Sequence, residues 1–473
     1  MAPEVLYAIF IHLKCDIDTP FTHLLRVSWV CRYWRTVVLG RSSLWDSLSI
    51  ISPKCSHIEM ASLWLHRGRP MLVDIYLENN DSSARDAFSG LLSIVADHSS
   101  RLKSIAIVST VDISVPRQYS RPLAPAKHLR EVRINCANMT PTVRDYVVGF
   151  IQSSQLTSLV MSQLFAGMDG VSCITPSFAT LLELVCGFDV HMTQILAELP
   201  AIRSLELDVF GASLGSALGE KEKVELPILE LSITGNDESK CSFLRRVVCP
   251  QLETFRVNKG VDQTLKIDAL SSFICASGRV LKGLYVTLGE DTPHRFKLRS
   301  LFRDLPALEI LHLSCPGEVC WDRMHYEFLP NLTELHYGQQ LPSSLGTVIA
   351  LGLPTARLRS LRIDGPVVRF EETLKHLIST CSGLRALSIT LCPNTHLAVF
   401  LSAISLCGTW DHLTTLCITV EDATSIIRHL LRFPWCLSSL RTLEIHSESI
   451  DIYRAQKLEE IRELKVEICG FNR

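Results

Sequence analysis

The chain has 473 residues, and its 47 Lys and Arg residues almost balance its 49 Asp and Glu residues, giving a formal net charge of −2. That balance argues against a nucleic-acid-binding surface or an anionic-membrane anchor as the main role of the chain. Apolar residues make up 47% of the chain and charged residues 20%, which excludes a disordered protein, and the 7% aromatic share indicates a mainly aliphatic core.

Apolar stretches such as Val5–Leu13 and Leu345–Leu353 are too short to span a bilayer. The N-terminus lacks the basic segment, apolar core and small-residue cleavage site of a secretion signal. The 17 cysteines include no C-x-x-C pair, and Cys186 and Cys417 stand where Leu or Val would fit. We therefore expect reduced thiols in a cytoplasmic or nuclear protein.

A zinc site is the alternative use of the cysteines. The nearest ligand pattern is Cys315 and Cys320 with His312, but a second pair of ligands is missing from it. The sequence therefore predicts no metal and no cofactor.

The first 45 residues predict a small helical region. Apolar residues at positions 5, 6, 9, 10 and 13 form one face of a helix, and Pro3 and Glu4 suit its first turn. A second helical stripe, with one break, runs through Leu24, Val27, Cys31, Trp34 and Val38.

The order of these residues resembles an F-box, in the style of the large F-box families of mushroom-forming fungi. The pattern is Pro-Glu-Val-Leu-x-x-Ile-Phe-x-x-Leu, then Leu-Leu-Arg-Val-Ser-x-Val-Cys-Arg-x-Trp-Arg, then Ser-x-Leu-Trp, and it ends at Trp45. Met1 and Ala2 stand where family members usually have Leu-Pro. The alternative is a plain helical cap for the repeats that follow.

The resemblance implies a three-helix module that docks on a Skp1-type adaptor, which connects to a cullin and a RING subunit of a ubiquitin ligase. An F-box protein performs no chemistry and holds the substrate. By position in the family pattern, the following residues would supply apolar helical surfaces, some facing the adaptor and some the module's own core: Pro3, Val5, Leu6, Ile9, Phe10, Leu24, Val27, Cys31 and Trp34.

The rest of the chain is dominated by the pattern L-x-x-L-x-φ, where φ is apolar. It recurs about every 26 residues, within the range of leucine-rich repeats, with these first positions: Leu102, Leu129, Leu156, Leu181, Ile202, Ile228, Leu252, Leu281, Leu308, Leu332, Leu358, Leu384, Leu413, Leu440 and Ile461. A further unit begins at Leu72. Trp45, Leu48 and Ile50 fit once more, so the helical region is expected to pass directly into the first strand.

Each unit predicts a strand followed by a helix. The end of the segment 384–389 alternates apolar and polar side chains, whereas Val143, Val147, Phe150 and Ile151 have helical spacing. We expect an α/β fold in which parallel strands stack into a curved solenoid with the sheet on its concave face, resembling leucine-rich repeats. The expected domains are an F-box at 1–45, a junction with irregular first repeats at 46–100 and the solenoid at 101–473.

Exposed strand positions suggest a candidate substrate-binding patch. They fall at the third and fifth residues of each unit, and the fifth residues of four consecutive repeats are Tyr285, His312, His336 and Arg362. The adjacent third position adds Glu334. Such polar and aromatic clusters are typical of binding surfaces, and the alternative is an ordinary solvated strand face.

One pattern suggests an enzyme. Gly211–Gly215 fits G-x-S-x-G, with Ser213 as the nucleophile of a hydrolase. The segment lies in the interval between two repeats, where small residues simply form a loop, so we expect no catalytic activity.

The sequence thus predicts the substrate-recognition subunit of an SCF-type (Skp1–cullin–F-box) ubiquitin ligase. Its expected partners are a Skp1-type adaptor, through it a cullin, and a protein substrate, with no nucleic acid and no membrane. The alternative is a ligase-independent leucine-rich-repeat scaffold with a degenerate F-box.

Overall fold

The computed structural model describes residues 2–14, 20–113, 125–136, 140–152, 154–161, 180–187, 196, 199, 201–209, 223–257, 267–287, 302, 305–315, 329–339, 357–364, 381, 383–391, 400, 412–432, 439–449 and 465–469. The chain divides into two compact units, Met1–Ala212 and Ser213–Arg473. Among the described helices, none has the length and apolar character needed to cross a membrane.

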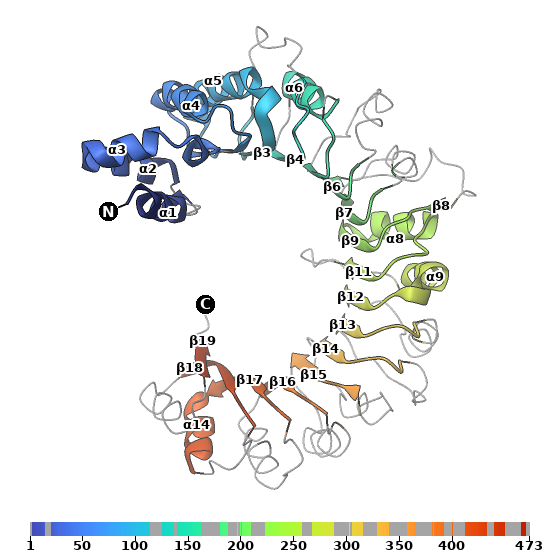
Figure 1. Ribbon diagram of the computed structural model, residues 1–473. Helices are drawn as coiled ribbons and strands as arrows, with labels where there is room; N and C mark the ends of the chain where they lie inside the picture. The colour runs from blue at the N-terminus through green and yellow to red at the C-terminus, as the bar shows by residue number, and fades with distance from the viewer. Residues whose placement is uncertain are drawn as a thin grey trace. The chain divides into compact units, whose positions relative to one another are not determined.

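The first unit begins with three short helices and a single 3-10 turn (Figure 1): α1 Pro3–Lys14, α2 Pro20–Val30, α3 Arg32–Leu39 and η1 Ser42–Trp45. The break predicted in the second helical stripe falls at Cys31. This residue has an extended backbone and caps α3, because its sulfur accepts a hydrogen bond from the backbone N–H of Trp34. The second stripe therefore forms two helices, α2 and α3, rather than one.

The helical region passes into the sheet through Trp45. This residue is fully buried, its Nε1–H donates to the carbonyl oxygen of Val38 at 2.8 Å, and its ring packs edge-to-face on Trp64 at 4.5 Å. A side chain at Gly68 would place its Cβ 2.6 Å from the carbonyl oxygen of Trp45. Trp45 thus joins the packing of the helical region to that of the first strand–helix pair.

Parallel strands form the sheet of the first unit, each paired in register with the next: β1 Ser47–Ile51, β2 Val73–Asn79, β3 Leu102–Ser109, β4 Glu131–Cys136, β5 Ser158–Met161, β6 Glu183–Gly187 and β7 Ser204–Val209. Three helices lie along one side of the strands (Figure 1): α4 Cys55–Arg67, α5 Arg85–Asp97 and α6 Pro141–Gln152. Two 3-10 turns, Ser82–Ala84 and Ser99–Arg101, flank α5.

The second unit repeats this arrangement with these parallel strands: β9 Glu230–Gly235, β11 Thr254–Val257, β12 Gly283–Thr287, β13 Ile310–Cys315, β14 Glu334–Gln339, β15 Ser360–Asp364, β16 Ala386–Leu391, β17 Thr415–Asp422, β18 Thr442–Ser449 and β19 Lys465–Cys469. Its described helices are α8 Asp237–Arg246, α9 Ile267–Ser277 and α14 Ala423–Arg432, with a 3-10 turn at Gly278–Val280. A separate pair joins β8 Val224–Glu225 to β10 Val247–Val248.

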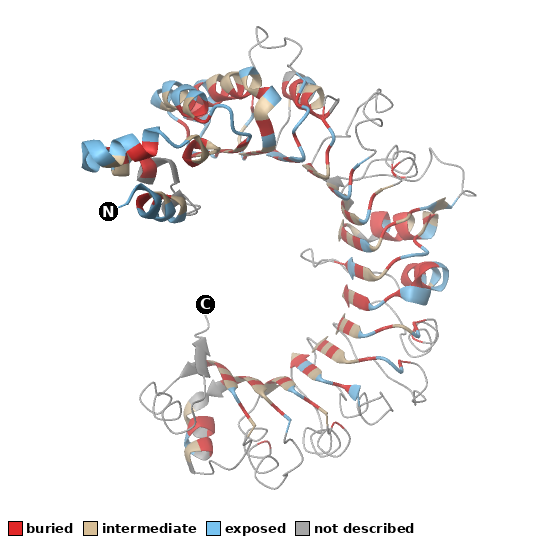
Figure 2. Ribbon diagram, in the orientation of Figure 1, coloured by how far each residue is buried: buried red, intermediate tan, exposed pale blue. Residues whose placement is uncertain are grey.

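The strand registers confirm the phase of the repeat. In the paired repeats before the last one, the fourth residue of each repeat lies opposite the fourth residue of the next, as in Leu311, Leu335 and Leu361. Among the described side chains, residues four and six of the repeats are buried in the core, and so is residue one except for Leu72, which is exposed. The residue between the fourth and the sixth is half-buried or exposed, so buried and partly exposed bands alternate along the strands (Figure 2). This alternation follows from the two-residue period of a strand.

The last repeat is shifted by two residues from the predicted phase. Leu443 pairs with Val466, which the sequence pattern placed at the sixth position, and Ile445 pairs with Ile468. Residues 464–468 alternate apolar and polar side chains, so the fourth and sixth positions of the repeat can be placed in two registers. Only the pairing with β18 distinguishes them.

Candidate functional site

The first three helices carry the candidate adaptor-binding residues, and burial divides these residues into groups. Three are fully buried: Leu6, Phe10 and Leu24. Two are half-buried: Val27 and Trp34. Four are exposed: Pro3, Val5, Ile9 and Cys31. A partner protein can contact the exposed group, whereas the buried group holds the helical region together.

Side-chain contacts fix α1 against the elements that follow it. Phe10 packs edge-to-face on Trp34 of α3, with 5.5 Å between ring centroids. The hydroxyl groups of Tyr7 and Ser43 are hydrogen-bonded at 2.9 Å. These contacts use one face of α1, and they leave the face that carries Val5 and Ile9 directed to solvent.

Exposed apolar side chains are concentrated in this region. Twelve large apolar side chains stand well exposed in the described part of the chain, and six of them lie in the first three helices: Val5, Ile9, Trp29, Val30, Tyr33 and Leu39. Figure 2 shows the exposed surface of α3. Single exposed apolar residues are ordinary on a protein surface, but such a concentration on three short helices is typical of a protein-interaction site.

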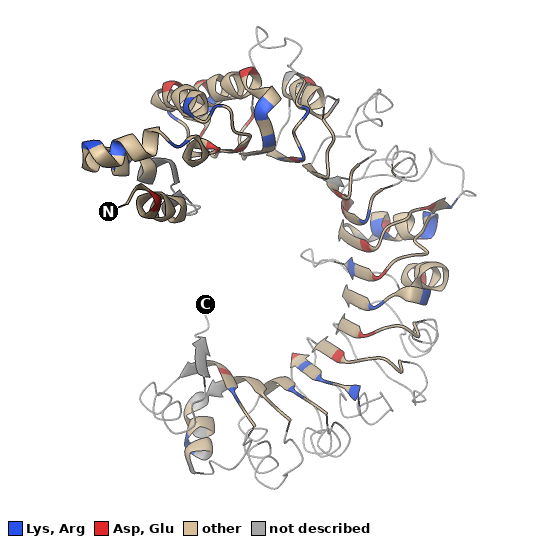
Figure 3. Ribbon diagram, in the orientation of Figure 1, with Lys and Arg blue, Asp and Glu red and all other residues tan. Residues whose placement is uncertain are grey.

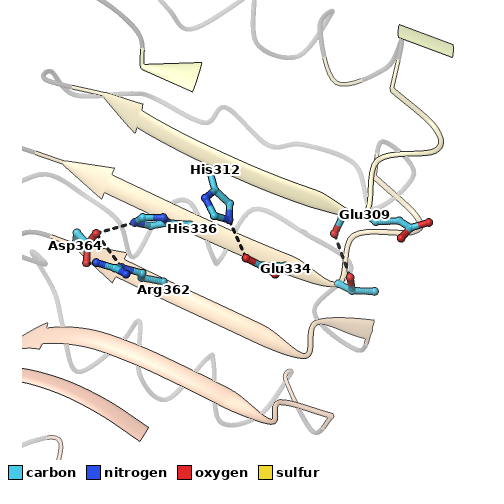
Figure 4. A network of polar contacts seen from close by, with 7 residues as sticks. Glu309, His312, Glu334, His336, Arg362 and Asp364 are labelled. Carbon is cyan, nitrogen blue, oxygen red and sulfur yellow. Dashed lines mark hydrogen bonds and ion pairs between the residues drawn. The ribbon is translucent and has the colours of Figure 1, made fainter. Parts of the chain in front are cut away.

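The second candidate site is a row of side chains that crosses five strands of the second unit. The registers place Arg256, Tyr285, His312, His336 and Arg362 opposite one another on β11 to β15. All five predicted substrate-binding residues, including Glu334, therefore lie on neighbouring strands of one sheet face. Figure 4 shows four of them: His312, Glu334, His336 and Arg362. Figure 3 shows an acidic residue on β14 and both a basic and an acidic residue on β15.

His312 and Glu334 form the first polar pair of this row. The Nε2 atom of His312 lies 2.8 Å from Oε1 of Glu334. Burial lowers the pKa of His312 below 6.5, and the charges of His336 and Arg362 act in the same direction, while Glu334 opposes them. Because burial is the largest of these effects, the contact at neutral pH is a hydrogen bond to a neutral imidazole.

Asp364 is the centre of the second polar group. His336 Nε2 lies 2.6 Å from Oδ2 of Asp364, and the Nε–H of Arg362 donates to both carboxylate oxygens at 3.1 Å. Burial alone would raise the pKa of Asp364, but the hydrogen bonds from His336 and Arg362 outweigh it and hold that pKa below its usual range. Asp364 is therefore an ionised carboxylate that orients two neighbouring side chains.

Tyr285 lies between Arg256 and His312 in the row. Its ring contacts the edge of His312 with 4.4 Å between centroids, and the guanidinium carbon of Arg256 lies 4.7 Å from its centroid. A Cβ at Gly283 would lie 3.1 Å from Cε2 of the tyrosine. The glycine thus leaves space for the ring to lie along its own strand, between a cation and an imidazole.

The sequence pattern alone misses two members of this network, Arg256 and Asp364. Arg256 is the fifth residue of the repeat before that of Tyr285, and Asp364 lies two residues after Arg362 on the same face of β15. Extending the row by one repeat and by one step along the strand would have found both.

A cavity of about 630 Å³ lies where the chain enters β14 to β17. It is lined by Glu309, Asn331, Thr333, Arg357, Arg359, Gly383, Arg385 and His412. Arg357 donates to the carbonyl oxygen of Pro330 at 3.0 Å, whereas the side chains of Arg359 and Arg385 have no hydrogen-bond or ion-pair partner among the described residues. Three arginines against one glutamate make the cavity suited to an anionic group.

Comparisons with known proteins give little beyond the fold. No protein-family model matches the chain, and no curated protein matches it. Among solved structures, the leucine-rich repeat-containing protein LegL7 from Legionella pneumophila is similar, with 15% identity and a TM-score of 0.35, over 60% of this chain and 91% of that chain. A similarity this distant carries no argument about function, and the repeat is established by the strand registers.

The hydrolase and zinc alternatives from the sequence both involve residues outside the described part of the chain. The G-x-S-x-G segment around Ser213 is one of them, and Cys320 of the candidate zinc pattern is the other. The remaining member of that pattern with a described side chain, His312, has Glu334 as its partner. The two surfaces on the helices and on the second-unit sheet are therefore the candidates that carry the functional argument.

Proposed function

We propose that this chain is the substrate-recognition subunit of an SCF-type ubiquitin ligase and has no catalytic role of its own. The observation that carries the proposal is the concentration of exposed apolar side chains on the three helices whose sequence resembles an F-box. The occupant of this surface is a Skp1-type adaptor, through which the chain joins a cullin.

The sheet of the second unit supports the other half of the proposal, substrate binding. Arg256, Tyr285, His312, His336 and Arg362 present aromatic and charged groups on rigid, hydrogen-bonded strands. Aromatic and arginine side chains carry much of the energy at protein interfaces, and a preordered surface loses little entropy on binding. The substrate in this proposal is a protein that covers this row.

The arginine cavity adds a preference for charge. Arg359 and Arg385 are exposed and unpaired within the described part of the chain, so a carboxylate or phosphate group of the substrate can take both as partners. A substrate segment rich in acidic groups suits the cavity better than a basic one.

Binding of the purified full-length chain to a purified Skp1-type adaptor tests the first half of the proposal. We expect the double substitution Val5→Asp with Ile9→Asp to abolish binding while circular dichroism stays unchanged, because both side chains are exposed, by 50% and 41%. Leu63→Asp is the matched control, since Leu63 is 55% exposed on α4, outside the helical region.

Leu6 and Phe10 are unsuitable for this test although the family pattern includes them. Both are fully buried, so a charge at either position would unfold the helical region and remove binding for a different reason. Wild-type affinity in the Val5 and Ile9 double variant would show that this face of α1 does not contact the adaptor. No affinity for the adaptor in the wild-type chain would favour a ligase-independent scaffold.

A further inference from the structure

The row of fifth-position residues continues beyond Arg362. The registers carry it to Ser388 on β16, Cys417 on β17 and Glu444 on β18. His446 lies two residues after Glu444, so its side chain leaves the same face of β18. A thiol, a carboxylate and an imidazole are thereby brought together on two adjacent strands.

The ligand atoms of these three side chains lie close together, although not yet at the distances found around a bound zinc ion. One ligand atom from each of Cys417, Glu444 and His446 lies within 4.8 Å of the other two. The Nε2 atom of His446 is 3.0 Å from Oε1 of Glu444. In a tetrahedral zinc site, neighbouring ligand atoms lie about 3.3–3.6 Å apart, so small side-chain rotations would bring the three donors to bonding distance.

The backbone beneath the cluster is fixed. Strands β17 and β18 are parallel and paired in register, with Cys417 directly opposite Glu444 and Thr419 opposite His446. All three side chains are half-buried, which leaves a path for an ion and shields it from bulk water on one side. Rigid strands hold such ligands more accurately than loops do.

We propose that Cys417, Glu444 and His446 bind Zn²⁺, with the fourth coordination position open to water. The donor set favours this ion, because one thiolate, one imidazole and one carboxylate suit zinc and exclude Mg²⁺ and Ca²⁺, which take oxygen ligands. Three protein ligands and one open position is an arrangement that zinc proteins use when the ion must meet an exogenous ligand.

Binding releases one proton, that of the thiol. The proton that His446 Nε2 shares with Oε1 of Glu444 moves to Nδ1, the other ring nitrogen, so that Nε2 can coordinate the ion. Burial raises the pKa of Cys417, and the charge of Glu444 adds to this effect while a hydrogen bond with Ser388 opposes it, so the free thiol carries its proton. On binding, the Zn–S bond forms as the S–H bond breaks, and the proton leaves to the solvent. Zinc deprotonates a coordinating thiol in this way, and no redox step is involved.

The sequence alone gives no signal for this site. Cys417 and Glu444 are 27 residues apart and belong to different repeats, so no short ligand spacing joins them. The usual search for paired cysteines and histidines therefore predicts no metal, and only the strand register brings the three residues to one place.

Cobalt titration of the full-length chain, after metal removal with a chelator, tests the site directly. We expect wild-type protein to bind one Co²⁺ with an intense near-ultraviolet thiolate-to-cobalt band that Zn²⁺ abolishes by competition. Cys417→Ser should lose the band, and His446→Gln and Glu444→Gln should weaken Zn²⁺ affinity at least about tenfold, because loss of a mere outer-sphere partner already costs that much.

Cys275→Ser is the matched control, because Cys275 is an exposed cysteine of the same unit, on α9. We expect it to retain the band and the affinity, and Zn²⁺ to raise the melting temperature of this variant and of the wild type but not of Cys417→Ser. The proposal is overturned if Cys417→Ser keeps the thiolate band, if its Zn²⁺ affinity equals that of the wild type, or if wild-type protein binds no ion at micromolar Zn²⁺.

Discussion

The charge states of single residues in the row on β11 to β15 are set by their neighbours, which the sequence does not show. His312 is paired with Glu334, but burial outweighs the carboxylate and lowers its pKa, so it is neutral at pH 7. Asp364 is ionised, because His336 and Arg362 hold its pKa below the usual range. At neutral pH the row therefore contains a neutral imidazole on β13 and a fixed negative charge on β15.

His312 provides a residue-scale prediction. The pKa of His312 is lowered in the folded chain, so the imidazole binds a proton more readily when the chain is unfolded. Protonation therefore lowers the free energy of unfolding as the pH falls below about 6.5. Above that pH the contribution disappears. We expect an NMR titration of the His312 ring to give a midpoint below 6.5, with His312→Gln used to assign the signal. A midpoint at or above 6.5 would mean that the ion pair with Glu334 outweighs burial.

Trp45 shows how one residue couples two elements, and its loss tests that coupling. We expect Trp45→Ala to lower the free energy of unfolding of the first unit by about 3–5 kcal/mol, as for other fully buried large aromatic residues. Trp29→Ala is the control, because Trp29 is 70% exposed and its removal should cost no more than about 0.5 kcal/mol. Urea denaturation measures both, and equal effects would contradict the packing described for Trp45.

At the scale of elements, the sequence predicts the strands well because their burial is periodic. Leu311, Leu335 and Leu361 lie opposite one another as the repeat requires. The predicted phase is wrong in the last repeat, at Val466, because apolar residues there recur every two residues and a shift of two residues keeps the same apolar positions on one face of the strand. The side-chain pairs of the row, and the cluster at Cys417, depend on register between repeats and lie beyond any single-repeat pattern.

The arginine cavity provides an element-scale prediction. We expect Arg359→Glu with Arg385→Glu to reduce binding of substrate proteins by at least about tenfold and to leave adaptor binding unchanged, because it reverses the charge of two unpaired cavity residues. Binding to the wild type should weaken as salt rises. Arg441→Glu is the control, since Arg441 is exposed at the same repeat position but does not line the cavity. An equal loss of substrate binding in Arg441→Glu would show that the cavity is not the site of substrate binding.

At the scale of the whole molecule, adaptor binding and substrate binding are proposed for different units. The helices of the first unit carry the exposed apolar surface, and the strands of the second unit carry the polar row and the cavity. A variant in one surface should therefore leave binding at the other unchanged. Point substitutions suit this comparison better than deletion of residues 1–45, because the deletion would remove Trp45 from the core.

The most direct test of the central claim is quantitative affinity purification of the tagged full-length chain from its cells, followed by mass spectrometry. We expect the wild type to recover a Skp1-type adaptor, a cullin and a RING subunit together. The Val5→Asp and Ile9→Asp double variant should lose all three and keep the substrate proteins, whereas Leu63→Asp should keep everything. Recovery of substrates without adaptor or cullin by the wild type, or equal recovery of the ligase subunits by the double variant, would contradict the account.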